Sequence, residues 1–264
     1  MVDAAGVART LAAIRARAPL IHNITNSVVT NTTANALLAV GASPAMVEAA
    51  EEVAEFAARA DALVINLGTM TAPRAAAIRL AVAAARAAGT PWVLDPVAVG
   101  GLAFRTALAH ELLTFHPAAI RGNTSEIHSL AGGAGYGRGP ESTISADSAP
   151  EMARALALRA GCVVAVTGEV DTITDGTRVA ALRNGHAMMT RVTGTGCTAT
   201  AIVGACLAVE PDAFLATAHG LALIGIAGEL AAARSRGPGS LQLELLDALY
   251  GLDAATIAAR LVSL

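Results

Sequence analysis

The chain has 264 residues, enough for one large α/β domain and not clearly enough for two, so we expect a single domain over residues 1–264. Its residues are 54% hydrophobic but only 3% aromatic, a mixture that suits close-packed helices on a sheet better than a β-sandwich. The net charge of −3 gives no electrostatic support for a nucleic-acid partner, and the complete absence of lysine excludes a lysine nucleophile, a Schiff base or a P-loop lysine.

The cysteines and the most apolar segments bear on where the protein works. Cys162, Cys197 and Cys206 are widely spaced and form no CxxC pair, so we expect neither a disulfide scaffold nor a structural zinc site. Residues 1–19 are alanine-rich, are broken by arginines, and lack the apolar core of a signal peptide. The uncharged run 192–209 starts with glycine and threonine, and its apolar part falls short of the ~20 residues that span a bilayer. We therefore expect a cytoplasmic protein without a membrane partner.

Hydrophobic periodicity and turn residues predict an alternation of strands and helices in the first half of the chain. The predicted elements, in chain order, are a strand over 19–25, helices over 30–40 and 44–60, a strand over 62–68, a helix over 73–88, a strand over 92–96, a helix over 106–115, a strand over 118–122 and a helix over 124–130.

In the second half, the Gly- and Ser-rich segment 131–149 is predicted to be a surface loop. It is followed by a helix over 150–160, a strong strand over 162–168, and a hairpin that pairs 171–175 with 178–182. From Cys197 onward the chain is predicted to be mostly helical. Strands that alternate with helices indicate an α/β fold with a mainly parallel central sheet covered by helices on both faces.

In such folds ligands gather beyond the carboxyl ends of the strands. Polar residues and glycines stand at these predicted ends, which makes that edge of the sheet the expected site. They are Asn23, Asn26, Asn66, Gly68, Asp95, Asn123, Thr167 and Gly168.

The sequence Gly194-Thr195-Gly196-Cys197 predicts an anion site. Two glycines let successive N–H groups point inward, and the helix expected to begin at Cys197 adds unpaired donors and its positive dipole end. An ordinary strand-to-helix turn is an equally good interpretation of the glycines alone. Cys197 is either a small buried hydrophobe or, since a helix N-terminus lowers the pKa of a thiol, a partly ionised functional group.

Two acidic residues are candidate ligands for Mg²⁺, which typically takes one or two carboxylates together with phosphate and water. Asp95 ends an apolar strand, and its alternative role is to cap a turn opened by Pro96. Glu126 lies three residues after Asn123, the spacing of a capping box, and a carboxylate in that first turn also faces the edge of the sheet.

Three further residues are open to two interpretations each. Arg121 precedes the Asn123 turn and would bind either a phosphate or a structural acid, and Thr167 would contact a nucleotide phosphate or merely end its strand. Met46, in the short segment 42–46, is an adaptable apolar contact for a small ring or a core residue.

Six segments in register resemble the hydroxyethylthiazole kinase family of the ribokinase-like superfamily. They are Pro19-Leu-Ile-His-Asn-Ile-Thr-Asn26, Gly41-Ala-Ser-Pro-Ala-Met46, Leu94-Asp-Pro-Val-Ala-Val-Gly100, Arg121-Gly-Asn-Thr-Ser-Glu126, Val164-Ala-Val-Thr-Gly168 and Gly194-Thr-Gly-Cys197. The wider superfamily has aspartate where this chain has Cys197, and cysteine there is typical of the thiazole-kinase branch.

The resemblance implies a ribokinase-like fold and Mg²⁺-dependent transfer of the ATP γ-phosphoryl group to the hydroxyl of 4-methyl-5-(2-hydroxyethyl)thiazole, in thiamine biosynthesis and salvage. It also implies a homotrimer with active sites at the subunit interfaces. With the strand-end positions, it assigns Met46, Gly194, Asn26 and Gly68 to the thiazole alcohol, Arg121, Thr167, Asn123, Thr195 and Gly196 to ATP, Asp95 and Glu126 to the metal, and Cys197 to catalysis.

Phosphoryl transfer has a loose transition state, so positioning and charge stabilisation matter more than a strong base. We therefore expect Cys197 to position the substrate hydroxyl and at most to accept its proton weakly. The alternatives are a hydroxymethylpyrimidine-phosphate kinase or an ATP-dependent hydrate dehydratase of the same fold, a cysteine hydrolase with Cys197 as nucleophile, and a nucleotide sensor without turnover.

Overall fold

The computed structural model describes residues 2–132 and 149–264. At the centre of this part of the chain is one eight-stranded sheet with the order β2-β1-β3-β4-β5-β6-β7-β8. The strands are β1 (Leu20–Ile24), β2 (Ser43–Ala45), β3 (Ala62–Asn66), β4 (Trp92–Asp95), β5 (Ala119–Asn123), β6 (Val163–Thr167), β7 (Asp171–Thr174) and β8 (Val179–Leu182).

The pairing of the strands agrees with the predicted topology. All pairs from β2 through β6 are parallel, and β6, β7 and β8 are joined by antiparallel pairs. The central strands are buried on both faces, which explains why they read as continuous apolar runs rather than as alternating ones. The mainly parallel sheet is therefore confirmed, with the predicted hairpin forming one edge.

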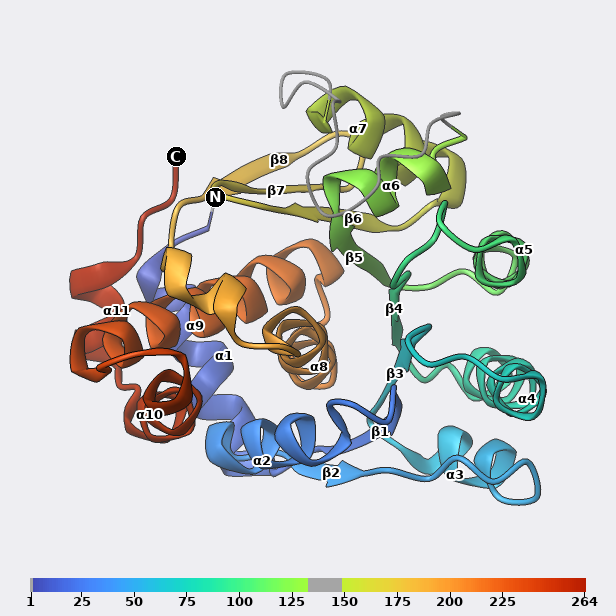
Figure 1. Cartoon of the computed structure of the whole chain (residues 1–264), viewed down its shortest axis with the longest axis horizontal. Helices are drawn as coiled ribbons and strands as arrows, with labels where there is room; N and C mark the ends of the chain where they lie inside the picture. Colours follow the sequence, from blue (N-terminus) through green and yellow to red (C-terminus); the bar gives the residue numbers. More distant parts are fainter. Residues whose placement is uncertain (1, 133–148) are drawn as a thin grey trace.

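Helices cover both faces of the sheet, as expected (Figure 1). One face carries α1 (Ala4–Arg17), α2 (Thr30–Val40), α8 (Thr195–Leu207), α9 (Ala213–Arg234), α10 (Pro238–Gly251) and α11 (Ala254–Arg260). The other carries α3 (Val53–Arg59), α4 (Ala72–Ala88), α5 (Ala103–Leu113), α6 (Thr124–Leu130) and α7 (Ala149–Ala160). Each layer of helices encloses its own apolar core against the sheet.

Helix α8 lies unusually close to the sheet because it presents a glycine to the strands. A Cβ built on Gly204 would lie 2.5 Å from the Val64 side chain of β3, and one built on Gly220 of α9 would lie 2.8 Å from the Val203 backbone of α8. Glycine is what permits such close approach. Helix α8 is thereby held between the sheet and α9, and its first turn lies at the carboxyl ends of the strands.

One sequence prediction was wrong near the N-terminus, and one helix there had not been predicted. The helix predicted over 44–60 is instead the edge strand β2 followed by the short helix α3. Pro44 is accommodated because an edge strand has one side on which no N–H donor is required. The alanine-rich start of the chain forms α1, whose N-cap is the Asp3 side chain. Helix α5 also begins at Ala103, earlier than predicted.

Two segments concern the membrane and loop predictions. Among the described residues, α9 is the one helix long and apolar enough to cross a membrane, but 78% of its most apolar window is buried inside the protein. Burial of that kind is typical of a core helix. Most of the loop predicted over 131–149 lies outside the described residues.

Candidate active site

The carboxyl ends of five parallel strands place polar residues at one edge of the sheet. Asn66, Asp95, Asn123 and Thr167 end β3, β4, β5 and β6, and Asn26 follows β1 shortly after its end. The first turn of α8 lies against the same region, since α8 contacts β1, β3 and β4. The sequence prediction that these strand ends converge is confirmed.

The loop before α8 takes the conformation that an anion site requires. Gly194 is the N-cap with φ of +87°, and a Cβ there would lie 2.5 Å from Val29, so glycine is needed on both counts. The helix begins at Thr195 and not, as predicted, at Cys197, which is its third residue. The first amides of a helix have no intrahelical acceptor, so those of Thr195 to Cys197 are donors for a bound anion.

The Arg121 side chain connects the ends of β5 and β6 to the N-terminus of α8. A Cβ built on Gly196 would lie only 2.6 Å from Arg121 Nη1, so the guanidinium rests on the glycine. Arg121 Nη2 donates to Thr167 Oγ1 at 2.6 Å, while the buried Nε has no hydrogen-bond partner in the described part of the chain. Arg121 also forms no ion pair within the described residues, so the structural acid considered as its partner is not found there.

A continuous chain of side-chain hydrogen bonds runs from Cys197 to Asp95. Asn26 Nδ2 donates to Cys197 Sγ at 3.4 Å and to Asn66 Oδ1 at 2.9 Å. Asn66 Nδ2 donates to Asp95 Oδ2 at 2.7 Å, and the Thr200 hydroxyl donates to the same oxygen at 2.9 Å. We call Asn26, Asn66, Asp95, Cys197 and Thr200 the polar chain. It links β1, β3 and β4 to α8 below the anion loop.

Gly68 contributes to the polar chain through its backbone. Its N–H donates to Asn66 Oδ1 at 2.9 Å, and a Cβ on Gly68 would lie 2.6 Å from Asn26 Cβ. Glycine at this position therefore leaves room for the Asn26 side chain. The predicted substrate residues Asn26 and Gly68 lie together with Cys197. Gly68 contributes to this arrangement by leaving room for the Asn26 side chain.

The environment of Cys197 decides against partial ionisation, which was one of the two interpretations of this residue. Burial, followed by the nearby Asp95 carboxylate, raises the pKa of the Cys197 thiol to about 11. The cysteine-hydrolase alternative also lacks its base, because the His22 imidazole donates from Nε2 to Val47 O at 2.8 Å and burial lowers its pKa. Cys197 is therefore a neutral thiol held by an amide.

Asp95 has one satisfied oxygen and one unsatisfied oxygen. The residue is 1% exposed, and burial raises the pKa of its carboxyl to about 6. Oδ2 accepts both hydrogen bonds described above, whereas Oδ1 has no partner among the described residues. An orphaned buried carboxylate oxygen is suited to a cation, because buried charge requires compensation.

Glu126 forms the predicted capping box and does more. Its Oε2 accepts from Asn123 N–H at 2.9 Å while Asn123 Oδ1 accepts from Glu126 N–H at 2.9 Å. Its Oε1 accepts from Ala98 N–H at 3.0 Å, which ties the loop after β4 to α6. Both oxygens are thus engaged, and the described residues contain no cluster of three or more His, Cys, Asp or Glu with metal-site geometry.

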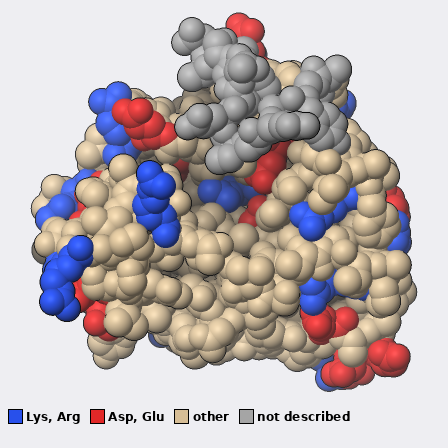
Figure 2. Space-filling model, in the orientation of Figure 1, with Lys and Arg blue, Asp and Glu red and all other residues tan. Residues whose placement is uncertain are grey.

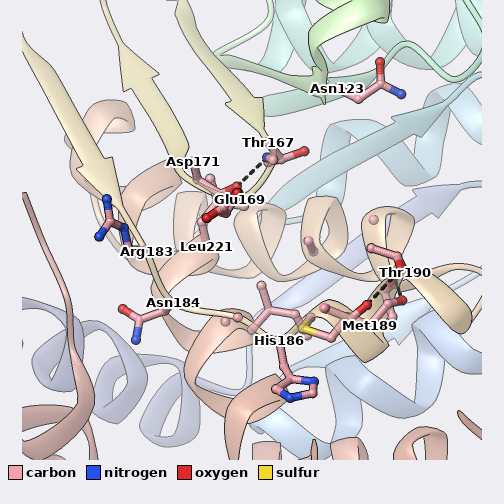
Figure 3. A pocket seen from close by; sticks show the side chains of 18 of the residues that line it. Asn123, Thr167, Glu169, Asp171, Arg183, Asn184, His186, Met189, Thr190 and Leu221 are labelled. Atoms are coloured by element: carbon pink, nitrogen blue, oxygen red, sulfur yellow. Dashed lines mark hydrogen bonds between the residues drawn. The ribbon is translucent and has the colours of Figure 1, made fainter. Parts of the chain in front are cut away.

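A cavity of about 710 Å³ opens beside the anion loop (Figure 3). Its walls are the β6–β7 turn, with Thr167, Glu169 and Asp171, and residues 183–190 after β8, while Leu221 and Ile224 of α9 contribute an apolar surface. Figure 2 shows basic and acidic atoms that meet in a hollow near the centre of this face, with further charged side chains around its margins.

The predicted site residues fall into two groups, those that line the cavity and those that do not. All five residues assigned to ATP line it, namely Arg121, Asn123, Thr167, Thr195 and Gly196. The polar chain and Gly194 are not part of the cavity lining. Met46 is half-buried beside the edge strand β2, and no hydrogen bond in the described residues connects it to Cys197.

Three residues of the site were not assigned a role there from the sequence. Asn66 was noted as a strand-end residue but given no role, although its position beside Gly68 was the available signal. Thr200 was not singled out in the sequence, and only its spacing one turn after Gly196 and Cys197 could have indicated a shared face. Asp171 of β7 lines the cavity and was read only as part of a hairpin.

Comparison with known proteins gives consistent results. The model of the hydroxyethylthiazole kinase family matches residues 11–255. A protein of Granulibacter bethesdensis named hydroxyethylthiazole kinase is 64% identical over 247 residues, which cover 94% of this chain and 90% of the relative.

Solved structures are similar at two levels. The hydroxyethylthiazole kinase protein from Pyrococcus horikoshii is 40% identical, with a TM-score of 0.91 and coverage of 97% of each chain. A ribokinase-like superfamily protein from Enterococcus faecalis is 14% identical, with a TM-score of 0.62 and coverage of 87% of this chain and 86% of its own. The second similarity concerns the fold alone, and it agrees with the predicted ribokinase-like architecture.

Proposed function

This chain belongs to the hydroxyethylthiazole kinase family, and we propose that it transfers the γ-phosphoryl group of ATP, with Mg²⁺, to the hydroxyl of 4-methyl-5-(2-hydroxyethyl)thiazole. The protein is a kinase, and the thiazole alcohol is its acceptor. The observation that carries the mechanism is the arrangement around the first turn of α8, where Arg121 rests on Gly196 beside a cavity and Cys197 is bonded into the polar chain by Asn26. We further assign the enzyme to thiamine biosynthesis and salvage in the cytoplasm.

In this proposal the nucleotide occupies the cavity lined by Thr167, Asn123 and Thr195, with its terminal phosphates at the anion loop. The amides of the first α8 turn and the Arg121 guanidinium stabilise the negative charge of the transferring group. Arg121 is already clamped by Thr167, so little ordering is left to occur when the phosphate binds. Positioning of this kind accounts for most of the rate enhancement in phosphoryl transfer.

The acceptor hydroxyl approaches from the side of the polar chain, with Gly194, Asn26 and Gly68 near the alcohol. Because the pKa of Cys197 is raised to about 11, the thiol is neutral and acts by hydrogen bonding rather than as a strong base. A missing general base gives up about 10²–10⁴-fold in rate, which a loose transition state tolerates. The enzyme is therefore expected to be slow for a kinase.

Asp95 is the residue that fits the proposed cation best, through its unpartnered Oδ1. Glu126 fits less directly, since both oxygens accept backbone N–H groups, although each keeps a lone pair for a water molecule. When bound, Mg²⁺ neutralises charge on the phosphates and helps to orient them. The protein's own contribution is to hold Asp95 in one orientation.

We also propose a homotrimer with active sites between subunits. Met46, assigned to the alcohol, lies at the edge strand β2, away from the lined cavity, so a neighbouring copy would complete its surroundings. Leu38, Leu243 and Tyr250 are exposed on α2 and α10, two helices that pack against each other. Light scattering coupled to size-exclusion chromatography tests this, and a monomer that is fully active would contradict it.

A coupled assay of ADP release with ATP, Mg²⁺ and the thiazole alcohol tests the function itself. We expect release that depends on all three. Turnover with a hydroxymethylpyrimidine but not with the thiazole alcohol would favour the other kinase of the same fold. Binding of ATP without turnover of either alcohol would favour a sensor.

A further inference from the structure

The carboxylate of Asp95 is held asymmetrically. Oδ2 accepts hydrogen bonds from Asn66 Nδ2 at 2.7 Å and from Thr200 Oγ1 at 2.9 Å, and both donors are neutral. Oδ1 is buried and has no partner within the described residues. Two donors on one oxygen prevent rotation of the carboxylate and present the other oxygen in a fixed direction.

The orientation of the Asn66 amide follows from its other contacts. Its Oδ1 faces the Gly68 backbone N–H at 2.9 Å, and a backbone N–H can only donate. The Asn26 amide also donates to Oδ1, at 2.9 Å. Nδ2 must therefore face Asp95, because a flipped amide would place Nδ2 against two donors and Oδ1 against the Asp95 carboxylate. Asn66 is 1% exposed, so water is not available to replace these bonds.

Thr200 connects the carboxylate to the anion loop. Its hydroxyl lies 2.9 Å from Asp95 Oδ2 and 3.3 Å from Gly196 O, and the shorter bond to the charged acceptor is the stronger. Since Thr200 is on α8, one turn after Gly196, the carboxylate and the first helical amides are fixed relative to each other. The Asp95 side chain therefore has a fixed position relative to the loop at which the transferred phosphoryl group is proposed to bind.

We propose that Asn66 and Thr200 are positioning residues for phosphoryl transfer: they occupy Asp95 Oδ2 and thereby direct Oδ1 to the divalent cation that accompanies the nucleotide. The inference rests on the proposed function for the identity of the reaction. The predicted effect on cation binding is independent of the proposed function, because cation binding is measured separately. Neither residue contacts the cation or the substrate in this scheme. Both act through Asp95.

The chain contains a matched control for Thr200. Thr198 is on the same helix and equally buried, but its hydroxyl has no hydrogen-bond partner in the described residues. Thr200→Val and Thr198→Val each replace one buried hydroxyl by a methyl group of similar size. Thr200→Ser keeps the hydroxyl and is the conservative variant that should restore function.

Two measurements compare these proteins. The first is the Mg²⁺ concentration that gives half-maximal ADP release with the thiazole alcohol. The second is the dissociation constant for Mn²⁺, measured by electron paramagnetic resonance in the presence of the non-hydrolysable analogue AMP-PCP. Loss of a residue that orients a metal ligand typically costs about 10–100-fold in metal affinity or activity. We expect about a tenfold rise in both quantities for Thr200→Val and for Asn66→Ala, and values within about twofold of wild type for Thr198→Val and Thr200→Ser.

The outcomes separate the two proposals. A wild-type protein that binds Mn²⁺ but releases no ADP contradicts the proposed function, while the Mn²⁺ comparison still tests the positioning role. The inference is overturned if folded Thr200→Val and Thr198→Val proteins have the same half-maximal Mg²⁺ concentration and bind Mn²⁺ equally well. If the valine variants fail to fold, Thr200→Ala and Thr198→Ala provide the same comparison, and thermal melts identify that case.

Discussion

The site has two halves that differ in how their side chains are held. In the buried half, at the ends of β1, β3 and β4, Asn26, Asn66 and Asp95 are at most 5% exposed and bond to one another. In the open half, around the β6–β7 turn and the segment after β8, Glu169 and Arg183 are exposed and face a cavity. The first turn of α8 belongs to both halves.

This difference indicates that the two halves have different roles and different tolerance to substitution. A buried network in which each group depends on its neighbours is rigid, and loss of one member leaves others without partners. An exposed lining exchanges lost contacts for water at little cost. We therefore expect isosteric changes in the buried half to reduce turnover strongly, and similar changes in the open half to alter nucleotide binding by small factors.

The largest effect is expected for Asp95→Asn, which keeps the shape of the side chain and removes its charge. Oδ1 would be lost as an anionic ligand, so phosphoryl transfer should fall about 100-fold or more, on the order of 3 kcal/mol of barrier. Steady-state ADP release at saturating ATP and alcohol measures this change. Activity near that of wild type would show that the polar chain is structural only.

The same variant should be more stable than the wild type at high pH. Burial raises the pKa of Asp95 from 3.8 to about 6, so the folded state holds this proton more tightly than the unfolded state does. The cost of the charge is absent below pH ~4, appears as the pH rises through 6, and reaches about 3 kcal/mol above it. Urea unfolding at pH 8 and at pH 4 should show a gain for Asp95→Asn only at pH 8.

The next largest effect should come from the turn that both halves share. In Gly196→Ala the new Cβ would lie 2.6 Å from Arg121 Nη1 and would displace the guanidinium from the anion loop. We expect kcat/KM for ATP to fall about tenfold or more, at least 1.4 kcal/mol, without loss of helix stability, because alanine favours a helix over glycine by about 1 kcal/mol.

The control for this change is Gly239→Ala on α10, where a Cβ meets no atom within 4 Å. It should leave kcat/KM for ATP unchanged. If Gly196→Ala were equally silent, Arg121 would not be part of the nucleotide site, and the apparent join between the two halves would be only a packing contact.

An intermediate effect is expected at Cys197, the member of the polar chain nearest the alcohol. Cys197→Asp should retain or raise phosphorylation, since burial beside Asp95 raises the pKa of a carboxylate there toward that of a useful base. Cys197→Ala removes the acceptor of the Asn26 hydrogen bond and should reduce kcat about tenfold. Collapse of activity in a folded Cys197→Asp protein would contradict the positioning role of the thiol.

How far the sequence predicts this molecule differs between the halves. Buried parallel strands such as β3 and β6 are apolar throughout and end at polar residues, so both the sheet and its functional edge could be predicted. Strand β2 could not, because Pro44 followed by spaced apolar residues also fits a helix start, and only pairing with β1 decides between them.

Contacts between distant segments set the limit for the site. Arg121 and Gly196 were both predicted to face phosphate, but their direct contact depends on how closely α8 approaches the sheet. Partial ionisation was one of two interpretations of Cys197, and it failed because position at a helix N-terminus was weighed without burial and without Asp95, whose proximity no local pattern encodes. Thr200 belongs to the same class of residue, with a role defined only by its partner.

The smallest effect is expected in the open half, at Asp171. Its Oδ1 accepts the Gly168 N–H at 3.0 Å, and the half-buried carboxylate lies in the cavity proposed for the nucleotide. Asp171→Asn keeps the accepting oxygen and removes a negative charge near bound phosphates. KM for ATP should therefore decrease about twofold at low salt, with kcat unchanged, and the difference should shrink as ionic strength rises because screening weakens the repulsion.

Burial raises the pKa of Asp171 to about 6, so wild type and variant should also converge below that pH, where the carboxyl is protonated. A large fall in kcat for Asp171→Asn would instead place this carboxylate among the groups that act on the reacting phosphate, and the open half would then be as strictly organised as the buried one.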